Sequence, residues 1–255
     1  MRIVLIGSGN LATQLAPALK KSGNRIVCVY SRKIKNATTL ANKIKTKATN
    51  KISELPIDAD LYIVAIQDDA IQLVLDQLEF NPKLIVHTSG SVPLTVLSSK
   101  YKNSGVFYPL QTFTLTGKTN WKDTPILIEG FNKYSFTILE KLAKDISSNV
   151  VKVTSVKRSS IHLAAVFANN FVNHMFTISS DILKKEKISF DLLKPIILET
   201  TSRVIKGDPL KSQTGPAKRK DHKTISKHLA MLHGDLDKKK VYQSITDSIL
   251  NKYSN

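Results

Sequence analysis

Cysteine and long apolar runs are scarce in this sequence of 255 residues. The single cysteine, Cys28, cannot form a disulfide within the chain, which fits a reducing, cytoplasmic environment. It stands in the apolar stretch RIVCVY, so we expect it to pack in a core. No uncharged apolar run reaches the roughly 18 residues that a membrane span needs. The amino-terminal MRIVLIGSG has too short an apolar run for a signal peptide and predicts a first strand instead.

Acidic residues are also few, because 20 Asp and Glu stand against 38 Lys and Arg, for a net charge of +18. Such an excess points to anionic partners, and nucleic acid has to be considered. The lysines are scattered, however, with little interleaved arginine or aromatic residue, and the densest clusters are residues 218–223 and 238–240. The charge pattern therefore argues against nucleic acid as a partner and keeps it as a third hypothesis only.

The first half of the chain alternates apolar runs with segments of helical periodicity. Strands are predicted at residues 2–7, 24–31, 58–66, 82–90, 105–108, 124–130 and 149–153. Helices are predicted between them at residues 10–23, 35–46, 68–78 and 132–147. Strands separated by helices imply parallel pairing, so we expect an α/β domain with a doubly wound, Rossmann-like parallel sheet over residues 1–153.

Ligands bind such a sheet at the carboxyl ends of its strands, and the first of these ends carries a GxGxxA pattern. The pattern consists of Gly7, Ser8, Gly9, Asn10, Leu11 and Ala12. The first glycine allows a tight turn, the second lets the backbone approach a pyrophosphate, and the alanine permits close helix–strand packing. Its position between a strand and a helix predicts dinucleotide binding; a glycine turn without a ligand is the alternative.

The end of the second strand indicates which dinucleotide is preferred. A site for NAD usually carries a carboxylate here, but this chain has Ser31, Arg32 and Lys33 after Tyr30. An arginine can hold a 2′-phosphate through two hydrogen bonds, so Ser31 and Arg32 favour NADP. The alternative is that Arg32 and Lys33 are only solvated loop charges.

The third strand ends in Ala65, Ile66 and Gln67, whose backbone we expect beside the cofactor ribose. Asp68 and Asp69 follow at a helix start, where carboxylates commonly cap free amides. We therefore expect a capping role for these two aspartates.

The fourth strand ends in HTSGS, and Gly90 again suggests close approach of the backbone. Ser89 and Gly90 are expected to line the pocket near the nicotinamide. His87 is more simply explained as a hydrogen-bonded histidine at a strand end than as a catalytic group.

Strand signals stop after residue 153, and residues 154–255 are expected to form an all-helical substrate and dimerisation domain. Helices are predicted at residues 155–187, 189–207, 221–234 and 236–253, with Ser155 as the first N-cap. By fold analogy alone, such a domain closes over the nicotinamide and supplies substrate and dimer contacts.

The stretch IHLAAVFANNFVNHM combines an apolar composition with several polar side chains. At 100° per residue, His162, Asn169 and Asn173 fall within about 40° of one another, and Asn170 lies about 80° from His162. A proton donor beside orienting amides needs such a face, so His162 and Asn170 are the predicted catalytic residues. A self-satisfied network at a dimer interface is the alternative. We expect no metal site, because His162 and His174 lie about 120° apart without other ligands.

The ordered motifs resemble a bacterial family of Rossmann-like proteins whose carboxyl-terminal part is the domain of unknown function 2520. The motifs are GSGNLA, VYSRK, IVAIQDDAI, VHTSGSV, GVFYPLQTF, HLAAVFANNFVNH and TGPAKRKDHKTISKHLAML. The family is similar to pyrroline-5-carboxylate reductase, ketopantoate reductase, deazaflavin-dependent NADP oxidoreductases and dehydrogenases with a 6-phosphogluconate-dehydrogenase-like helical domain. The resemblance implies NADP(H) binding by the glycine loop, Ser31 and Arg32, and dimerisation through the helices.

The sequence departs from the family pattern in two places. A further charged residue, Arg158, lies close to the predicted catalytic histidine. Tyr108 stands where the family has histidine before PLQTF, and Arg219-Lys220-Asp221 stands where it often has RGD. Asp221 is expected to be a helix N-cap with an exposed Arg219 beside it. The alternative is that Arg219 reaches an anionic substrate or a partner subunit. Arg158, one turn before His162, could act as an electrostatic group toward substrate.

The sequence thus predicts an NADP(H)-dependent oxidoreductase that acts on a small carbonyl, hydroxyl or imine substrate. The first alternative is an NADP(H)-binding protein that senses redox state or regulates a partner without catalysis. The substrate itself does not follow from the residues or from the resemblance.

Overall fold

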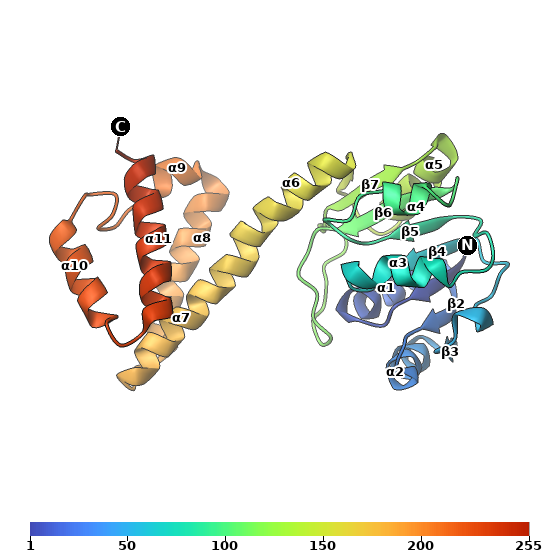
Figure 1. Ribbon diagram of the computed structural model, residues 1–255, viewed down its shortest axis with the longest axis horizontal. Helices are drawn as coiled ribbons and strands as arrows, with labels where there is room; N and C mark the ends of the chain where they lie inside the picture. Colours follow the sequence, from blue (N-terminus) through green and yellow to red (C-terminus); the bar gives the residue numbers. More distant parts are fainter. Residues whose placement is uncertain (255) are drawn as a thin grey trace. The chain divides into compact units, whose positions relative to one another are not determined.

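The computed structural model describes residues 1–254, and the chain divides into two compact units (Figure 1). The first unit spans Met1–Ala168, and the second begins at Asn169. The division expected from the sequence lies earlier, after residue 153. The difference arises because helix α6 (Ser155–Ala165) packs against the first unit through the buried Arg158. The boundary between functional domains stays a prediction.

An eight-stranded sheet forms the centre of the first unit, in the order β3-β2-β1-β4-β5-β6-β7-β8 (Figure 1). The strands are β1 (Arg2–Ile6), β2 (Arg25–Tyr30), β3 (Lys47–Thr49), β4 (Leu61–Val64), β5 (Ile85–His87), β6 (Ser104–Pro109), β7 (Ile126–Gly130) and β8 (Val150–Lys152). The order 3-2-1-4-5-6 is that of a doubly wound Rossmann sheet, which confirms the predicted fold class. The edge strand β3, which has only three residues, was not predicted.

The prediction of parallel pairing is wrong at one position, because β6 and β7 pair antiparallel. No helix separates these strands. Residues 110–125 instead turn back at the edge where β6 ends, and the Leu110 amide donates to the Pro125 carbonyl. A parallel connection has to cross to the opposite edge of the sheet, usually through a helix. A loop that returns at the same edge therefore gives an antiparallel pair.

Helices and short turns cover both faces of the sheet. They are α1 (Asn10–Lys21), α2 (Ile34–Ile44), η1 (Ile52–Glu54), α3 (Asp68–Asp76), α4 (Thr95–Ser98) and α5 (Lys133–Lys144). One apolar cluster packs α1, α2 and α5 on one face, and a second packs η1, α3 and α4 on the other. Cys28 is 3% exposed in the second cluster, as expected. Burial on both faces explains why β1 and β4 are continuous apolar runs.

Residues 169–254 contain helices and no strand. Continuing from α6, the elements are η2 (Val166–Phe171), α7 (Val172–Lys185), η3 (Phe190–Leu193), α8 (Lys194–Lys206), α9 (Pro209–Ser212), α10 (His222–Met231) and α11 (Leu236–Lys252). The N-cap of α6 is Thr154, whose side chain accepts from the Lys157 amide, and not Ser155 as predicted. Asp221 caps α10 as predicted. A detailed likeness to 6-phosphogluconate dehydrogenase stays a prediction.

The segment η2 is a π-helix between α6 and α7. A π-helix turns less per residue than an α-helix, so a single 100° spacing does not describe residues 162–173. The polar face drawn through His162, Asn169 and Asn173 is therefore not one continuous α-helical stripe. His162 is half-buried, whereas the side chains of Asn169, Asn170, Asn173 and His174 are exposed.

No helix within residues 1–254 is both long enough and apolar enough to cross a membrane.

Candidate functional site: a dinucleotide pocket beside a tyrosine–histidine pair

The glycine loop between β1 and α1 has the geometry that close approach to a ligand requires. Gly7 has φ of +128°, and a Cβ atom there would lie 2.0 Å from the Ala65 carbonyl oxygen. Only glycine fits this position without strain. Gly9 is the N-cap of α1 and makes no side-chain cap, and a Cβ there would meet no atom of residues 1–254 within 4 Å. The first amides of α1 are therefore available to an anionic group.

A pocket of about 620 Å³ lies at this loop, where the sheet order reverses between β1 and β4. It is lined by Gly7, Ser8, Gly9, Asn10, Leu11, Tyr30, Ser31, Arg32, Asn36, Ala65, Ile66, Gln67, Asp68, Ala70, Val74, Thr88 and Ser89. Eleven predicted cofactor residues are in this lining. Ala12 is instead fully buried under α1, in keeping with a packing role, and Gly90 lies just outside the lining.

The wall of the pocket after β2 is cationic. Arg32 is exposed, and the Ser31 amide donates to the Thr49 carbonyl, which fixes the loop to β3. The lining contains one carboxylate, Asp68, at the start of α3 rather than after β2. This donor set suits a 2′-phosphate better than a free ribose hydroxyl pair. The residues present therefore fit NADP(H).

The expected capping role of Asp68 and Asp69 is wrong in its detail. The N-cap of α3 is Gln67, without a side-chain hydrogen bond, and both aspartates lie in the first helical turn. Asp68 accepts a hydrogen bond from the Ser91 hydroxyl instead. This contact ties the start of α3 to the turn after β5.

The loop after β6 contacts the start of α1. The Asn10 amide donates to the Phe113 carbonyl at 2.9 Å, and the Gln14 amide donates to the Thr114 carbonyl at 2.9 Å. Phe113 also stacks on Trp121, with 5.6 Å between ring centroids. We call residues 110–118 the strap. The Asn10 side chain therefore binds the strap and also lines the dinucleotide pocket.

A tyrosine and a histidine meet where the turn after β5 faces α6. The Tyr108 hydroxyl oxygen lies 3.0 Å from His162 Nδ1, and the two rings meet edge to face. A Cβ atom on Gly90 would lie 2.7 Å from the His162 ring and 2.9 Å from the Tyr108 ring. Gly90 is thus the close-approach position that the sequence predicted, and its partner is the histidine. Burial raises the pKa of Tyr108, so its hydroxyl stays protonated.

His87 lies on the other side of the same turn and has a structural role. It is fully buried, and its Nδ1 accepts from the Ser89 amide at 3.2 Å. Burial, with a smaller contribution from the Arg158 charge, lowers the pKa of His87 to about 4. The ring is therefore neutral at physiological pH and shapes the turn that carries Ser89 and Gly90.

Arg158 does not face substrate, contrary to the expectation from the sequence. It is fully buried and forms an ion pair with Glu129 of β7, and it donates to the Val92 carbonyl. The Glu129 carboxylate also accepts from the Ser155 amide and hydroxyl at 2.9 and 2.8 Å. This network, which we call the Glu129–Arg158 clamp, joins β7, the turn after β5 and α6. Because Arg158 lies one turn before His162, the clamp fixes the part of α6 that leads to this histidine.

The predicted catalytic residue Asn170 belongs to the second unit, where its side chain is exposed. Its catalytic role stays a prediction. No group of three potential metal ligands gathers within the described part of the chain. The sequence marks Tyr108 only as a departure from the family pattern. Its pairing with His162, 54 positions along the chain, gave no signal by spacing.

Comparison with known proteins identifies the family. The model for "NADP oxidoreductase coenzyme F420-dependent" matches residues 2–90, and that for the domain of unknown function 2520 matches residues 124–249. A candidate NADP oxidoreductase from Bacteroides fragilis is 40% identical, covers 98% of both chains and has a TM-score of 0.93. The chain belongs to the family of Rossmann-type proteins with the domain of unknown function 2520. The predicted resemblance is thereby confirmed.

More distant members of the comparison share the fold of this family. A Thermotoga maritima protein is 22% identical, with 99% and 100% of the two chains covered and a TM-score of 0.81. The 1-pyrroline-5-carboxylate reductase of Streptococcus pyogenes is 14% identical, with 100% and 99% covered and a TM-score of 0.64. The glutamyl-tRNA reductase of Sulfolobus acidocaldarius is 32% identical over 109 residues. That match spans 42% of this chain and 24% of the curated relative's length.

Proposed function

We propose that the protein is an NADP(H)-dependent oxidoreductase that passes hydride between the nicotinamide and a small carbonyl, hydroxyl or imine substrate. The observation that carries the proposal is the hydrogen-bonded Tyr108–His162 pair against Gly90. Ser89, the residue before Gly90, lines the dinucleotide pocket, so a titratable pair adjoins the cofactor site. The family model for NADP oxidoreductases and the Bacteroides fragilis relative support the same reaction class.

The chain's own residues would bind and orient the cofactor. The glycine loop would hold the pyrophosphate at the amino terminus of α1, and Ser31 with Arg32 would hold the 2′-phosphate. Ala65, Ile66 and Gln67 would lie along the nicotinamide ribose. The bound nicotinamide supplies hydride chemistry, and the protein sets its orientation.

His162 would supply the proton that balances the hydride. In the reductive direction, the substrate oxygen or nitrogen would take a proton from Nε2 of the His162 ring when that ring carries a proton on both nitrogens. The neutral ring left behind would keep its Nδ1 proton and would donate it to the Tyr108 oxygen. Because burial keeps the Tyr108 hydroxyl protonated, tyrosine acts as the orienting partner and not as a base. Oxidation would use the same ring as proton acceptor.

The cofactor preference can be tested at Arg32. We expect Arg32→Gln to raise the Kd for NADPH about 10- to 100-fold, since a charge-assisted hydrogen bond is worth about 1.5–3 kcal/mol. The Kd for NADH should change by less than about threefold. Fluorescence titration with both nucleotides measures the two constants. Lys35→Gln, an exposed residue of α2 outside the pocket lining, removes the same charge and should leave both constants unchanged. Equal weakening of both nucleotides would contradict the 2′-phosphate assignment.

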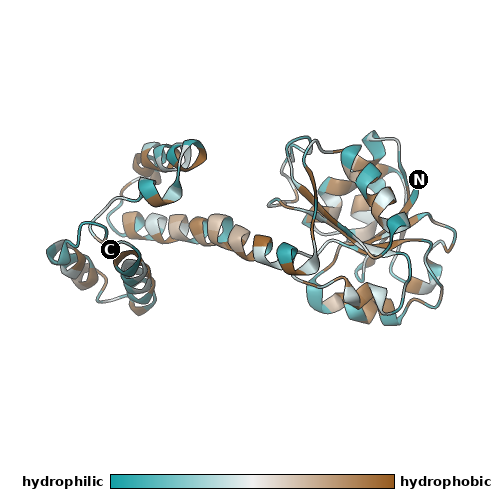
Figure 2. Cartoon of the chain, turned by 90° about the horizontal axis from the view of Figure 1, so that it is seen from above, coloured by the Kyte–Doolittle hydropathy of each residue, from teal (hydrophilic) through white to brown (hydrophobic). Residues whose placement is uncertain are grey.

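We further propose that the second unit completes its fold by forming a homodimer. Among residues 169–254, the buried apolar residues are Ala217 and Ile225. Large apolar side chains are instead 63–78% exposed at Leu192, Ile196, Leu198, Ile205, Met231 and Leu236. Figure 2 shows hydrophobic segments, in brown, on the helices of the second unit. A unit of this size with so little core needs a partner surface, and a second copy offers the same helices.

Sedimentation velocity measures the association directly. We expect the wild-type protein to sediment at twice the chain mass of 28.3 kDa. Ile205→Glu places a charge on the exposed apolar surface of α8 and should shift the equilibrium toward monomer. Thr137→Glu, on the exposed polar surface of α5 in the first unit, should leave the dimer intact. A monomeric wild-type protein at micromolar concentration would refute the proposal.

A further inference from the structure

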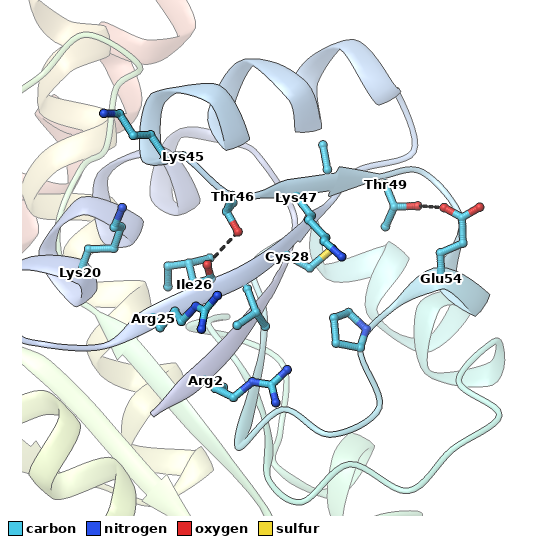
Figure 3. A pocket seen from close by; sticks show the side chains of 13 residues that line it. Arg2, Lys20, Arg25, Ile26, Cys28, Lys45, Thr46, Lys47, Thr49 and Glu54 are labelled. Carbon is cyan, nitrogen blue, oxygen red and sulfur yellow. Dashed lines mark hydrogen bonds between the residues drawn. The ribbon is translucent and has the colours of Figure 1, made fainter.

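A second large groove lies in the first unit and shares no lining residue with the dinucleotide pocket. It has a volume of about 890 Å³ and runs over β2, the edge strand β3 and the carboxyl-terminal ends of α1 and α2 (Figure 3). Five cationic side chains line it, namely Arg2, Lys20, Arg25, Lys45 and Lys47. We call it the basic groove. The proposed oxidoreductase chemistry gives it no role.

The positive charge of the basic groove is only partly neutralised by the protein. Arg2 and Arg25 occupy paired positions on β1 and β2, where like charges repel. Asp58 accepts hydrogen bonds from the two terminal guanidinium nitrogens of Arg2, but within residues 1–254 no ion pair engages Arg25, Lys45 or Lys47. These three cations therefore remain available to an anion from solution.

The single acidic residue of the lining is already engaged. Glu54 accepts a hydrogen bond from the Thr49 hydroxyl at 2.6 Å and pairs with Lys51 at 3.2 Å. Both interactions lower the pKa of Glu54, with the Thr49 contact contributing most. Glu54 therefore does not neutralise the lysines across the groove, and the site stays strongly cationic at neutral pH.

The backbone at the groove is irregular in two places. The register between β1 and β2 shifts at Val27, because Ile3 pairs with Ile26 while Val4 pairs with Cys28. Lys45 ends α2 with a φ of +53°, a conformation that usually selects glycine or asparagine. A bulge changes the direction of the side chains beside it, and a lysine at this C-cap costs backbone energy. Both irregularities lie in the groove wall.

We propose that the basic groove binds a compact anion that carries two or more adjacent phosphate groups. Its volume is that of a small-ligand site, and Arg25 with Lys47 provides the guanidinium and ammonium groups that recognise phosphate. No aromatic residue is present among the thirteen lining residues, so the groove has no stacking platform for the bases of a single-stranded nucleic acid. The ligand is therefore a small polyphosphate-bearing molecule, bound independently of the cofactor.

Isothermal titration with inorganic tripolyphosphate tests the site. The full-length protein is first saturated with NADPH, so that the glycine loop and Arg32 are occupied, and the buffer contains about 0.15 M salt, which matches physiological ionic strength. We expect one saturable site per chain. Arg25→Gln/Lys47→Gln should weaken it at least about tenfold, as expected for loss of charge-assisted hydrogen bonds. Lys133→Gln/Lys141→Gln removes two exposed charges from α5 and should change the affinity by less than about twofold.

Three results would overturn the proposal. The first is the absence of saturable binding at millimolar tripolyphosphate. The second is equal weakening in both double variants, which would mean that only the net charge attracts the anion. The third is a single-stranded RNA oligonucleotide that binds more tightly than tripolyphosphate and loses that affinity in the Arg25/Lys47 variant. Unchanged NADPH affinity verifies that each variant is folded. If the Arg25→Gln/Lys47→Gln variant does not fold, the single variant Lys47→Gln takes its place.

Discussion

Replacing His162 by glutamine is expected to reduce turnover by about 10²- to 10⁴-fold while the Kd for NADPH stays unchanged. The ring meets Tyr108 and Gly90, outside the lining of the dinucleotide pocket, so it would act on the substrate and not on cofactor affinity. The measurement is NADPH oxidation over a panel of small ketones, aldehydes and cyclic imines, together with a fluorescence titration of NADPH. Glutamine keeps a polar side chain at the position but cannot transfer a proton near neutral pH.

Two further variants separate proton transfer from orientation. Tyr108→Phe keeps the ring and removes the hydroxyl, so turnover should fall less than in His162→Gln, by about tenfold. His174→Gln changes an exposed histidine of α7 and should have no effect. Unchanged turnover in His162→Gln would sink the assignment of the proton donor. Tight NADPH binding without turnover of any panel member by the wild type would favour the non-catalytic, sensing alternative.

Breaking the Glu129–Arg158 clamp is expected to cost the first unit about 3–5 kcal/mol of its free energy of unfolding. In Arg158→Met the Glu129 carboxylate loses its buried partner, and the Val92 carbonyl loses its donor. Removing one member of a buried pair leaves an uncompensated charge, which is far more costly than removing both. Urea denaturation followed by tryptophan fluorescence measures the change, because Trp121 lies in the first unit.

The clamp hypothesis also predicts the outcome of a double substitution. Arg158→Met/Glu129→Leu should recover much of the lost stability, because neither side chain then carries a buried charge. Lys144→Met serves as the control, since it breaks the exposed pair with Glu140 and should cost about 0.5 kcal/mol or less. If Arg158→Met were as mild as this control, the clamp would not hold α6 on the sheet.

Much of the fold could be predicted from local sequence, because each buried strand is a short apolar run that ends in a turn. The order of elements and the glycine loop both follow from such local patterns. The antiparallel β6–β7 pair could not be foreseen, because the path of residues 110–125 depends on contacts with Asn10 and Gln14, about a hundred positions away. The edge strand β3 is too short to show a period of two.

Residues of the candidate site could be predicted where the backbone itself requires a residue type, such as glycine. Contacts between side chains that are far apart in the sequence could not be predicted. Gly90 could be singled out because close approach requires glycine, but nothing in the spacing indicated that His162 was the group approaching it. The prediction for Arg158 was wrong because its partner is distant in the sequence. A charged residue one turn before a histidine suggests substrate binding, and only the position of Glu129 on β7 reveals a buried ion pair.

The hydrogen bond from Asn10 to the strap has a consequence for how the pocket responds to its ligand. The Asn10 side-chain nitrogen has two amide protons, so the orientation that directs one to the Phe113 carbonyl also decides where the other can reach a phosphate oxygen. A dinucleotide that recruits this amide therefore changes the free energy of the strap, and by thermodynamic reciprocity any molecule that fixes the strap changes the affinity for the dinucleotide. Residues 110–118 would then act as an effector-sensitive element, coupled to the glycine loop through one side chain.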